Sequence, residues 1–174
     1  MRLLLCAALL LVAGPRLAQA QPADFAEEWR GQFEASARKF VALAEAVPAE
    51  AFEWQPADDV MSVAEVYMHV ARYNYAYLDQ NLGHPAPEAL DYEALQGVVT
   101  GKSEVVPILA ASMDHVREVT AAMSAEDWSA ATELYGRTVG SWAVLLQLVT
   151  HMNEHLGQSI AYARSNGVVP PWSR

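Results

Sequence analysis

The stretch from Ser141 to Pro171 constrains the fold more than any other part of the sequence. Its apolar residues recur every three or four positions, the spacing of one buried face of an α-helix. These residues are Trp142, Leu145, Leu146, Val149, Met152, Leu156 and Ile160. Ser141 is expected to cap the start, and Asn166-Gly167 followed by Pro170-Pro171 is typical of a helix end. The stretch therefore predicts one long amphipathic helix.

Two histidines stand four residues apart in this predicted helix. At ~100° per residue, His151 and His155 fall in the same narrow stripe, and their Cβ atoms are expected ~5–6 Å apart. Two imidazoles at this separation can converge on one divalent metal ion. A pair of surface or hydrogen-bonded core histidines is the alternative, but the largely apolar stripe favours a metal.

The letters HMNEH also match H-x-x-E-H, a signature of inverted zinc metalloproteases. Such a site takes a third, acidic ligand from further along the chain, and no Asp or Glu occurs between Leu156 and Arg174. Glu154 lies ~80° from the mean direction of the two histidines on the helical wheel. A protease is therefore disfavoured, and Glu154 is a flanking residue.

The first twenty residues have the pattern of a secretory signal peptide. One Arg precedes an apolar run from Leu3 to Ala13, and Ala18-Gln19-Ala20 is a small-x-small cleavage pattern. We expect cleavage after Ala20 and export to the periplasm or the medium. The only cysteine, Cys6, lies in this segment, so disulfides, cysteine nucleophiles and thiolate zinc sites are excluded from the mature chain.

Residues 21–174 are expected to form one domain with a real hydrophobic core. Without the leader the chain has 9 basic and 21 acidic residues, a net charge of −12. This balance disfavours nucleic acid as a partner. The apolar run of the leader is too short to span a bilayer, so no stable membrane anchor is expected after cleavage.

Helical periodicity recurs in three earlier segments, and nothing competes with an all-α architecture. The predicted helices run from Asp24 to Ala46, from Val63 to Asn81 and from Ser103 to Met123. Buried aromatic residues, Phe25 and Phe33 among them, are expected on the first helix. The aperiodic loop between Gly83 and Gly101 is read as a lid or a variable excursion. Thr132 to Val139 could contain an extended piece, but no sheet is expected from it.

The motif H-x-x-x-H-x-G-Q, running into Tyr162-x-Arg164-x-x-Gly167-x-x-Pro170-Pro171, resembles the last helix of the DinB/YfiT-like family. Trp54-x-Pro56, followed by a capping box at Ser62 to Glu65 and by His69, is similar to the second helix of that family. The resemblance implies a four-helix-bundle metalloprotein, which we expect to be antiparallel, and it implies that the protein could form a homodimer.

The resemblance also implies a third metal-ligating histidine on the second helix. His69 is the best residue for this role, because it shares its stripe with Ser62, Val66 and Tyr73, a mixed lining that suits a bundle interior. Taken alone, it would be read as a core histidine. His84 is expected to be an exposed loop residue, and His115 an edge residue with a weak claim to the metal.

Three histidines are a neutral ligand set that suits zinc and also nickel, iron, cobalt or copper. Positions not filled by protein would hold water. Gln158 could hydrogen-bond that water or a substrate, or pack and support a metal ligand. Glu154 and Glu65 are the nearest acidic candidates for a general base or for support of a ligand, although the helix cap is expected to occupy Glu65.

Family members with known activities include thiol-dependent transferases and isomerases. Since small thiols are cytoplasmic, export shifts the expectation to a metal-dependent hydrolase or nucleophilic-transfer enzyme acting on an unidentified small molecule. The alternative is a non-catalytic metal- or ligand-binding bundle.

Overall fold

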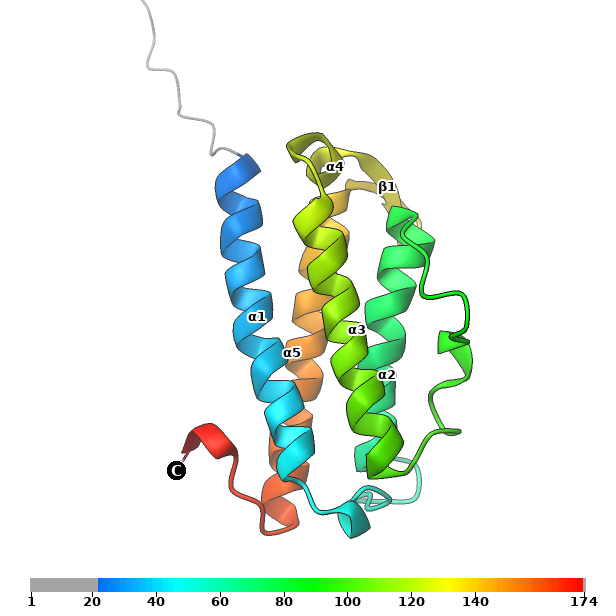
Figure 1. Ribbon diagram of the computed structural model, residues 1–174, viewed down its shortest axis with the longest axis vertical. Coiled ribbons are helices and arrows are strands. Elements are labelled where there is room, and N and C mark those ends of the chain that lie inside the picture. Colours follow the sequence, from blue (N-terminus) through cyan, green and yellow to red (C-terminus); the bar gives the residue numbers. More distant parts are fainter. Residues whose placement is uncertain (1–21, 174) are drawn as a thin grey trace, which may run out of the picture.

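The computed structural model describes residues 22–173, and the expected leader, Met1 to Ala20, lies outside this range. Four long helices pack side by side, and a two-stranded sheet lies at one end of them (Figure 1). The main elements are α1 (Pro22–Ala46), α2 (Val63–Ala76), α3 (Lys102–Ala122), α4 (Ala125–Ser129), β1 (Ala131–Leu134), β2 (Arg137–Gly140) and α5 (Ser141–Ser165). The expected all-α architecture is confirmed as a mostly helical fold, with the hairpin as the exception. No helix in the described range is long and apolar enough to cross a membrane.

The four long helices do not alternate in direction. Near the start of both α1 and α5, the indole nitrogen of Trp29 donates to the Leu145 carbonyl at 2.9 Å. Farther along both helices, Ser36 Oγ donates to Asn153 Oδ1 at 2.8 Å, so α1 and α5 run parallel. Helices α2 and α3 are parallel as well, and this pair is antiparallel to the first (Figure 1). The expected antiparallel bundle is therefore corrected to two parallel pairs.

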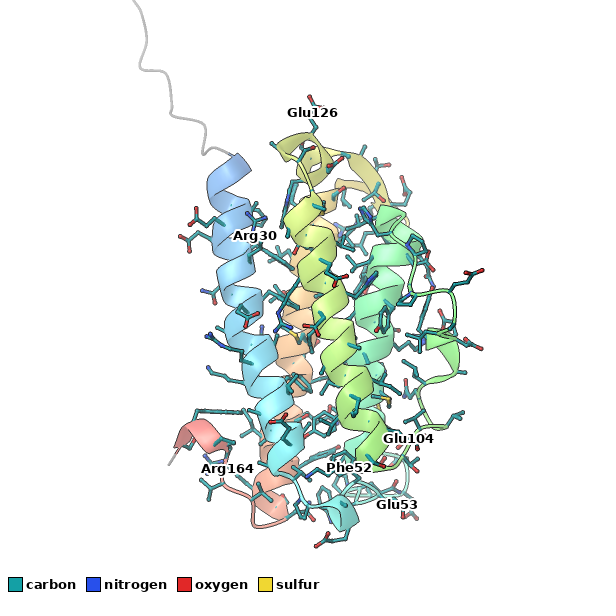
Figure 2. The ribbon with its side chains drawn as sticks, in the orientation of Figure 1. Arg30, Phe52, Glu53, Glu104, Glu126 and Arg164 are labelled. Atoms are coloured by element: carbon teal, nitrogen blue, oxygen red, sulfur yellow. The ribbon has the colours of Figure 1, made fainter. Side chains whose placement is uncertain are left out.

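The parallel course of α2 and α3 depends on the long connection between them. Residues 82–101 return along the bundle beside α2 (Figure 1). Helix α3 then ends beside the start of α1, where Arg30, labelled in Figure 2, donates from Nη1 to the Thr120 carbonyl at 3.1 Å. A connection of this length can span more than the ~30 Å of a bundle helix. It therefore removes the need for each helix to reverse the direction of the previous one.

The core is built on the apolar face of α1. Trp29 and Phe33 are buried and stack on each other with ring centroids 5.3 Å apart, and Phe40 packs edge-on against Tyr67 of α2. Phe25 differs from the expectation, because its side chain is 39% exposed at the first turn of α1. The four-residue spacing continues beyond the end of the core, so periodicity alone overestimates what is buried.

Helix α2 begins with the predicted capping box. Ser62 Oγ accepts from the Glu65 amide at 3.2 Å, and Glu65 Oε2 accepts from the Ser62 amide at 2.7 Å. The helix continues to the predicted end, but its last turn, Tyr77–Asn81, is a π-helix, η2. Gly83, at φ +72°, follows in a left-handed conformation and ends the helix. The capping box supports a fixed start for the helix that carries His69.

The segment from Thr132 to Val139 forms a β-hairpin, which corrects the expectation that it builds no sheet. Strands β1 and β2 pair antiparallel with Leu134 opposite Arg137. Tyr135 and Gly136 form the two-residue turn, with φ values of +51° and +73°. A two-residue hairpin turn with positive φ at both positions usually contains Asn-Gly. Because Tyr135 stands at the first position in place of Asn, the sequence did not predict this turn.

Helix α5 follows the hairpin and departs from the predicted pattern at its start. Gly140 is the N-cap, in place of the predicted Ser141. The hydroxyl of Ser141 instead donates to the Ala130 carbonyl at 3.1 Å and closes the base of the hairpin. Trp142 and Leu146 are 46% and 45% exposed instead of buried. The C-terminus is as predicted, since Gly167 at φ +74° ends the helix.

Candidate metal centre

Helices α2 and α5 bring His69, His151 and His155 together. One nitrogen from each ring can be chosen so that all three atoms lie within 4.8 Å of one another. His69 Nε2 and His151 Nε2 are the closest at 3.1 Å. The antiparallel contact between α2 and α5 places the middle of one helix against the middle of the other. The cluster therefore forms between α2 and α5, where each histidine is half-buried.

Two glutamines hold two of the rings by their other nitrogen. Gln96 Oε1 lies 2.9 Å from His69 Nδ1, and Gln158 Oε1 lies 2.8 Å from His155 Nδ1. An amide oxygen only accepts, so each of these rings carries its hydrogen on Nδ1. Nε2 of both His69 and His155 is then left with a lone pair. Such a partner fixes both the tautomer and the orientation of a ligating histidine.

The long connection brings Gln96 to the cluster, and several contacts hold it against α2 and η2. Arg72 forms an ion pair with Glu93. Gln80 Nε2 donates to the other carboxylate oxygen of Glu93 at 3.0 Å. Tyr92 donates its hydroxyl to Asp79 at 2.8 Å. This part of the connection is thus held in place as one wall of the site, whereas its composition predicted a lid or a variable excursion.

The surroundings favour neutral histidines. The pKa of His151 is lowered to about 4, mainly by burial and also by the nearby His155 and His69 rings. Burial also lowers the pKa of His69 and outweighs the hydrogen bond that His69 donates to Gln96, which raises it. The ring of Tyr73 covers both, with its centroid 4.7 Å from each imidazole centroid. His69 and His151 therefore each keep an unprotonated nitrogen at neutral pH, as metal ligation requires.

The cluster fits a divalent metal ion such as zinc. Two nitrogens that share one zinc ion at ~2.0–2.1 Å with tetrahedral angles lie about 3.3–3.4 Å apart, close to the 3.1 Å between His69 and His151. Within residues 22–173, no Asp, Glu or Cys joins the three histidines in the cluster. Three protein ligands with an open remaining position are typical of catalytic zinc sites. Imidazole nitrogens also accept other late divalent metals.

Comparison with protein-family models matched residues 32–162, about three quarters of the chain, to the DinB superfamily. The chain belongs to the DinB superfamily. The match includes α2, the connection that carries Gln96 and nearly all of α5. No curated protein matched the sequence at a significant level.

Solved structures show the DinB fold at low sequence identity. A DinB-like protein of Bacillus cereus is 18% identical, with a TM-score of 0.66 over 86% of this chain and 95% of that chain. A DinB-like protein of Bacillus subtilis is 15% identical, with a TM-score of 0.62 over 82% and 94%. A conserved protein of Enterococcus faecalis is 22% identical, with a TM-score of 0.55 over 82% and 93%. These likenesses support the fold of the DinB-superfamily chain.

The structure separates the other candidate residues of the DinB domain from its histidine cluster. Glu154 is exposed and lies outside the cluster. Glu65 is held in the cap of α2. His115 packs against Tyr75 with ring centroids 5.2 Å apart, and neither it nor His84 is part of the cluster. Gln158 belongs to the site through His155.

Two residues of the DinB site were missed in the sequence. Gln96 lies in an aperiodic loop, where no spacing rule links it to His69. Tyr73 follows His69 by four residues, so the i, i+4 rule places it on the same face, but a shared stripe alone does not predict that it packs on the histidine rings. Its ring packs on two of the three histidines.

Proposed function

We propose that the protein is an exported metal-binding protein in which His69, His151 and His155 hold one divalent ion, zinc by preference. The observation that carries this proposal is the convergence of three imidazole nitrogens within 4.8 Å. Support comes from the two glutamine amides on His69 and His155 and from the lowered pKa values of His69 and His151.

We further propose that the centre is catalytic, in a hydrolase or nucleophilic-transfer enzyme for a small molecule. When bound, such an ion acidifies a water ligand or polarises a substrate oxygen. The protein contributes three imidazole nitrogens, two amides that orient the rings, and an apolar wall from Tyr73 that limits water. Glu154 is a weak candidate for the general base because it is exposed. Gln158 acts as a positioning residue for His155.

A non-catalytic metal- or ligand-binding bundle is the second candidate. The observation in its favour is the close packing of Tyr73 over His69 and His151. A site closed in this way could store an ion without admitting a substrate. Metal-dependent turnover in a panel of esters, amides and electrophiles would support the enzyme, whereas tight metal binding without turnover would support this alternative.

Metal analysis of the purified protein tests the shared premise of both candidates. We expect about one zinc equivalent per chain, and a sharp loss of affinity in each of the variants His69→Ala, His151→Ala and His155→Ala. Helical content should persist, because apolar contacts carry the fold. His84→Ala and His115→Ala are the matched controls and should retain the ion. Loss of the ion in His115→Ala with no change in His69→Ala would refute the ligand set.

Export is proposed from the leader pattern alone. Mass spectrometry of the exported protein should find an N-terminus at Gln21. An intact Met1 to Ala20 on a soluble cytoplasmic protein would overturn export and would restore thiol-dependent transfer as the leading activity. A homodimer remains a proposal as well, and sedimentation or light scattering of the mature chain would test it.

A further inference from the structure

A pocket of about 180 Å³ lies beside the histidine cluster, between the end of α2 and the tip of the β-hairpin. Three tyrosines line it: Tyr73 and Tyr77 from α2 and its π-helical turn, and Tyr135 from the hairpin turn. The amide side chains of Gln80 and Asn81 contribute polar groups to the same wall. The pocket therefore combines aromatic rings with neutral hydrogen-bonding groups.

Tyr73 links this pocket to the histidines. Its ring lines the pocket and also packs on the imidazoles of His69 and His151, with 4.7 Å between centroids in both cases. The ring of Tyr77 approaches His151 edge-on at 6.1 Å. A molecule in the pocket would thus contact the same side chains that cover the cluster.

We propose that this pocket binds a small uncharged aromatic molecule, with phenol as its simplest representative, between Tyr135 and the Tyr73 and Tyr77 rings. The idea that a substrate of the metal centre binds in this pocket rests on the proposed function. Binding of the aromatic molecule itself depends only on the residues that line the pocket.

The size of the pocket sets the size of the ligand. A protein cavity of roughly 150 Å³ is known to hold one benzene molecule. A pocket of about 180 Å³ therefore has room for a single six-membered ring with one small substituent. Most drug-sized ligands need pockets of ~300 Å³ or more, and they would not fit without movement of the hairpin.

The lining sets the charge of the ligand. The residues that line the pocket include no Asp, Glu, Lys or Arg. A charged molecule would lose hydration there without gaining a counter-charge, which is unfavourable. Aromatic rings favour edge-to-face or offset contacts with another ring, and the amide and hydroxyl groups can bind one polar substituent. A neutral ring that bears a hydroxyl matches both features.

The backbone at Tyr135 indicates that the side chain is there for a reason other than folding. Its φ of +51° lies in the left-handed region, where a bulky side chain is strained. Such strain is concentrated at functional sites. The side chain is 68% exposed, yet its hydroxyl is within 2.7 Å of the Tyr77 hydroxyl. The strained turn therefore places an aromatic ring over the pocket, where Asn would give the easier turn.

Substitution of Tyr135 tests the pocket without breaking the hairpin. Tyr135→Asn creates the Asn-Gly pair that this turn prefers, so the hairpin should persist. Phenol binding, measured by calorimetry or by ligand-observed NMR, should weaken about tenfold in this variant, because one ring contact is lost. Tyr135→Phe keeps the ring and should retain most of the binding. Val98→Asn, at an apolar side chain that is 74% exposed and outside the pocket lining, should bind phenol like the unaltered protein.

Three results would overturn the proposal: no binding at millimolar phenol, equal binding to the unaltered protein and Tyr135→Asn, or tighter binding of benzoate than of phenol. Zinc is titrated into the same samples to separate this inference from the proposed function. Histidine-dependent zinc binding without phenol binding would refute the pocket and leave the metal centre standing. Tyr135-dependent phenol binding without zinc binding would support the ligand site and refute the metal centre.

Discussion

His69 Nε2 and His151 Nε2 lie 3.1 Å apart, although the two residues are separated by 82 positions in the chain. Gln96 holds the hydrogen of His69 on Nδ1, so His151 is the donor and His69 the acceptor between the two Nε2 atoms. Binding of an ion by both Nε2 atoms requires His151 to move its hydrogen to Nδ1. The His69 ring, by contrast, is already in the tautomer that ligation needs.

Removal of the orienting amides should weaken metal binding. Gln96→Leu and Gln158→Leu keep much of the side-chain bulk but lose the oxygen that bonds to His69 or His155. We expect a ~10- to 100-fold loss of zinc affinity in each variant, measured by competition with a chromophoric chelator. Gln32→Leu, at an exposed position of α1, is the control and should bind normally. Unchanged affinity in both site variants would show that the amides do not orient the ligands.

The metal-free protein should lose stability as the pH falls. Burial lowers the pKa of His151 to about 4 and also lowers that of His69, whereas both lie near 6.5 in the unfolded chain. Between about pH 6.5 and pH 4, the unfolded chain therefore binds more protons than the native state. The free energy of unfolding should therefore decrease as the pH is lowered through this window. Above the window, these two histidines should not make it depend on pH.

Denaturant titrations of the metal-free protein at several pH values measure this effect. We expect the histidines to account for about 1–2 kcal/mol, because partial exposure reduces the full linkage value. His151→Gln should have a flatter profile across the same window. Superimposable profiles of the two proteins would show that His151 is not held neutral by burial.

Truncation of a core aromatic residue should be costly. Phe33 is only 2% exposed and stacks on Trp29. Phe33→Ala should lower the free energy of unfolding by about 3–5 kcal/mol, measured by urea denaturation. Phe25→Ala removes the same group from a position that is 39% exposed, and it should cost much less. Equal losses in the two variants would contradict the described packing of α1.

Loss of the α2 cap should be mild and specific. Ser62→Ala removes the hydroxyl that accepts from the Glu65 amide, at an expected cost of about 1 kcal/mol in thermal or chemical unfolding. Ser103→Ala is the matched control, because this exposed serine lies in the first turn of α3 without serving as its cap. A cost for Ser62→Ala no larger than that for the control would mean that the cap does not hold the start of α2.

Much of the helical framework could be predicted because it depends on local rules. The four-residue spacing of His151 and His155 placed both rings on one face, and the capping box at Ser62 placed the start of the helix that carries His69. The approach of His69 to the pair depends on how α2 packs against α5. Family resemblance supplied that relationship, which no spacing within either helix contains.

The features that were missed depend on contacts between distant segments. Gln96 reaches His69 only because the whole connection crosses back along the bundle, and a loop has no period from which such a contact follows. Helix direction was misjudged for the same reason. Trp142 and Leu146 have the spacing of buried residues, but they lie on the side of α5 that faces the hairpin and solvent, while Val144 and Leu145 of the same turns are buried. The hairpin itself was missed because its turn contains Tyr135 where Asn is expected.

Several side-chain hydrogen bonds attach the hairpin to η2, in addition to its contacts with α5 and the burial of Leu134 in the core. Besides the Tyr77–Tyr135 hydroxyl contact, Asn81 donates its amide to the Glu133 carbonyl at 2.6 Å, and Thr132 donates its hydroxyl to the Asn81 carbonyl. A two-stranded sheet is marginal by itself, so its stability depends on these bonds and on the burial of Leu134. Local unfolding of the hairpin should therefore cost far less than global unfolding, and its amide hydrogens should exchange with solvent much faster than those in the middle of α5. The wall that carries Tyr135 is thus the part of the site that can open while α2 and α5 keep the three histidines in register.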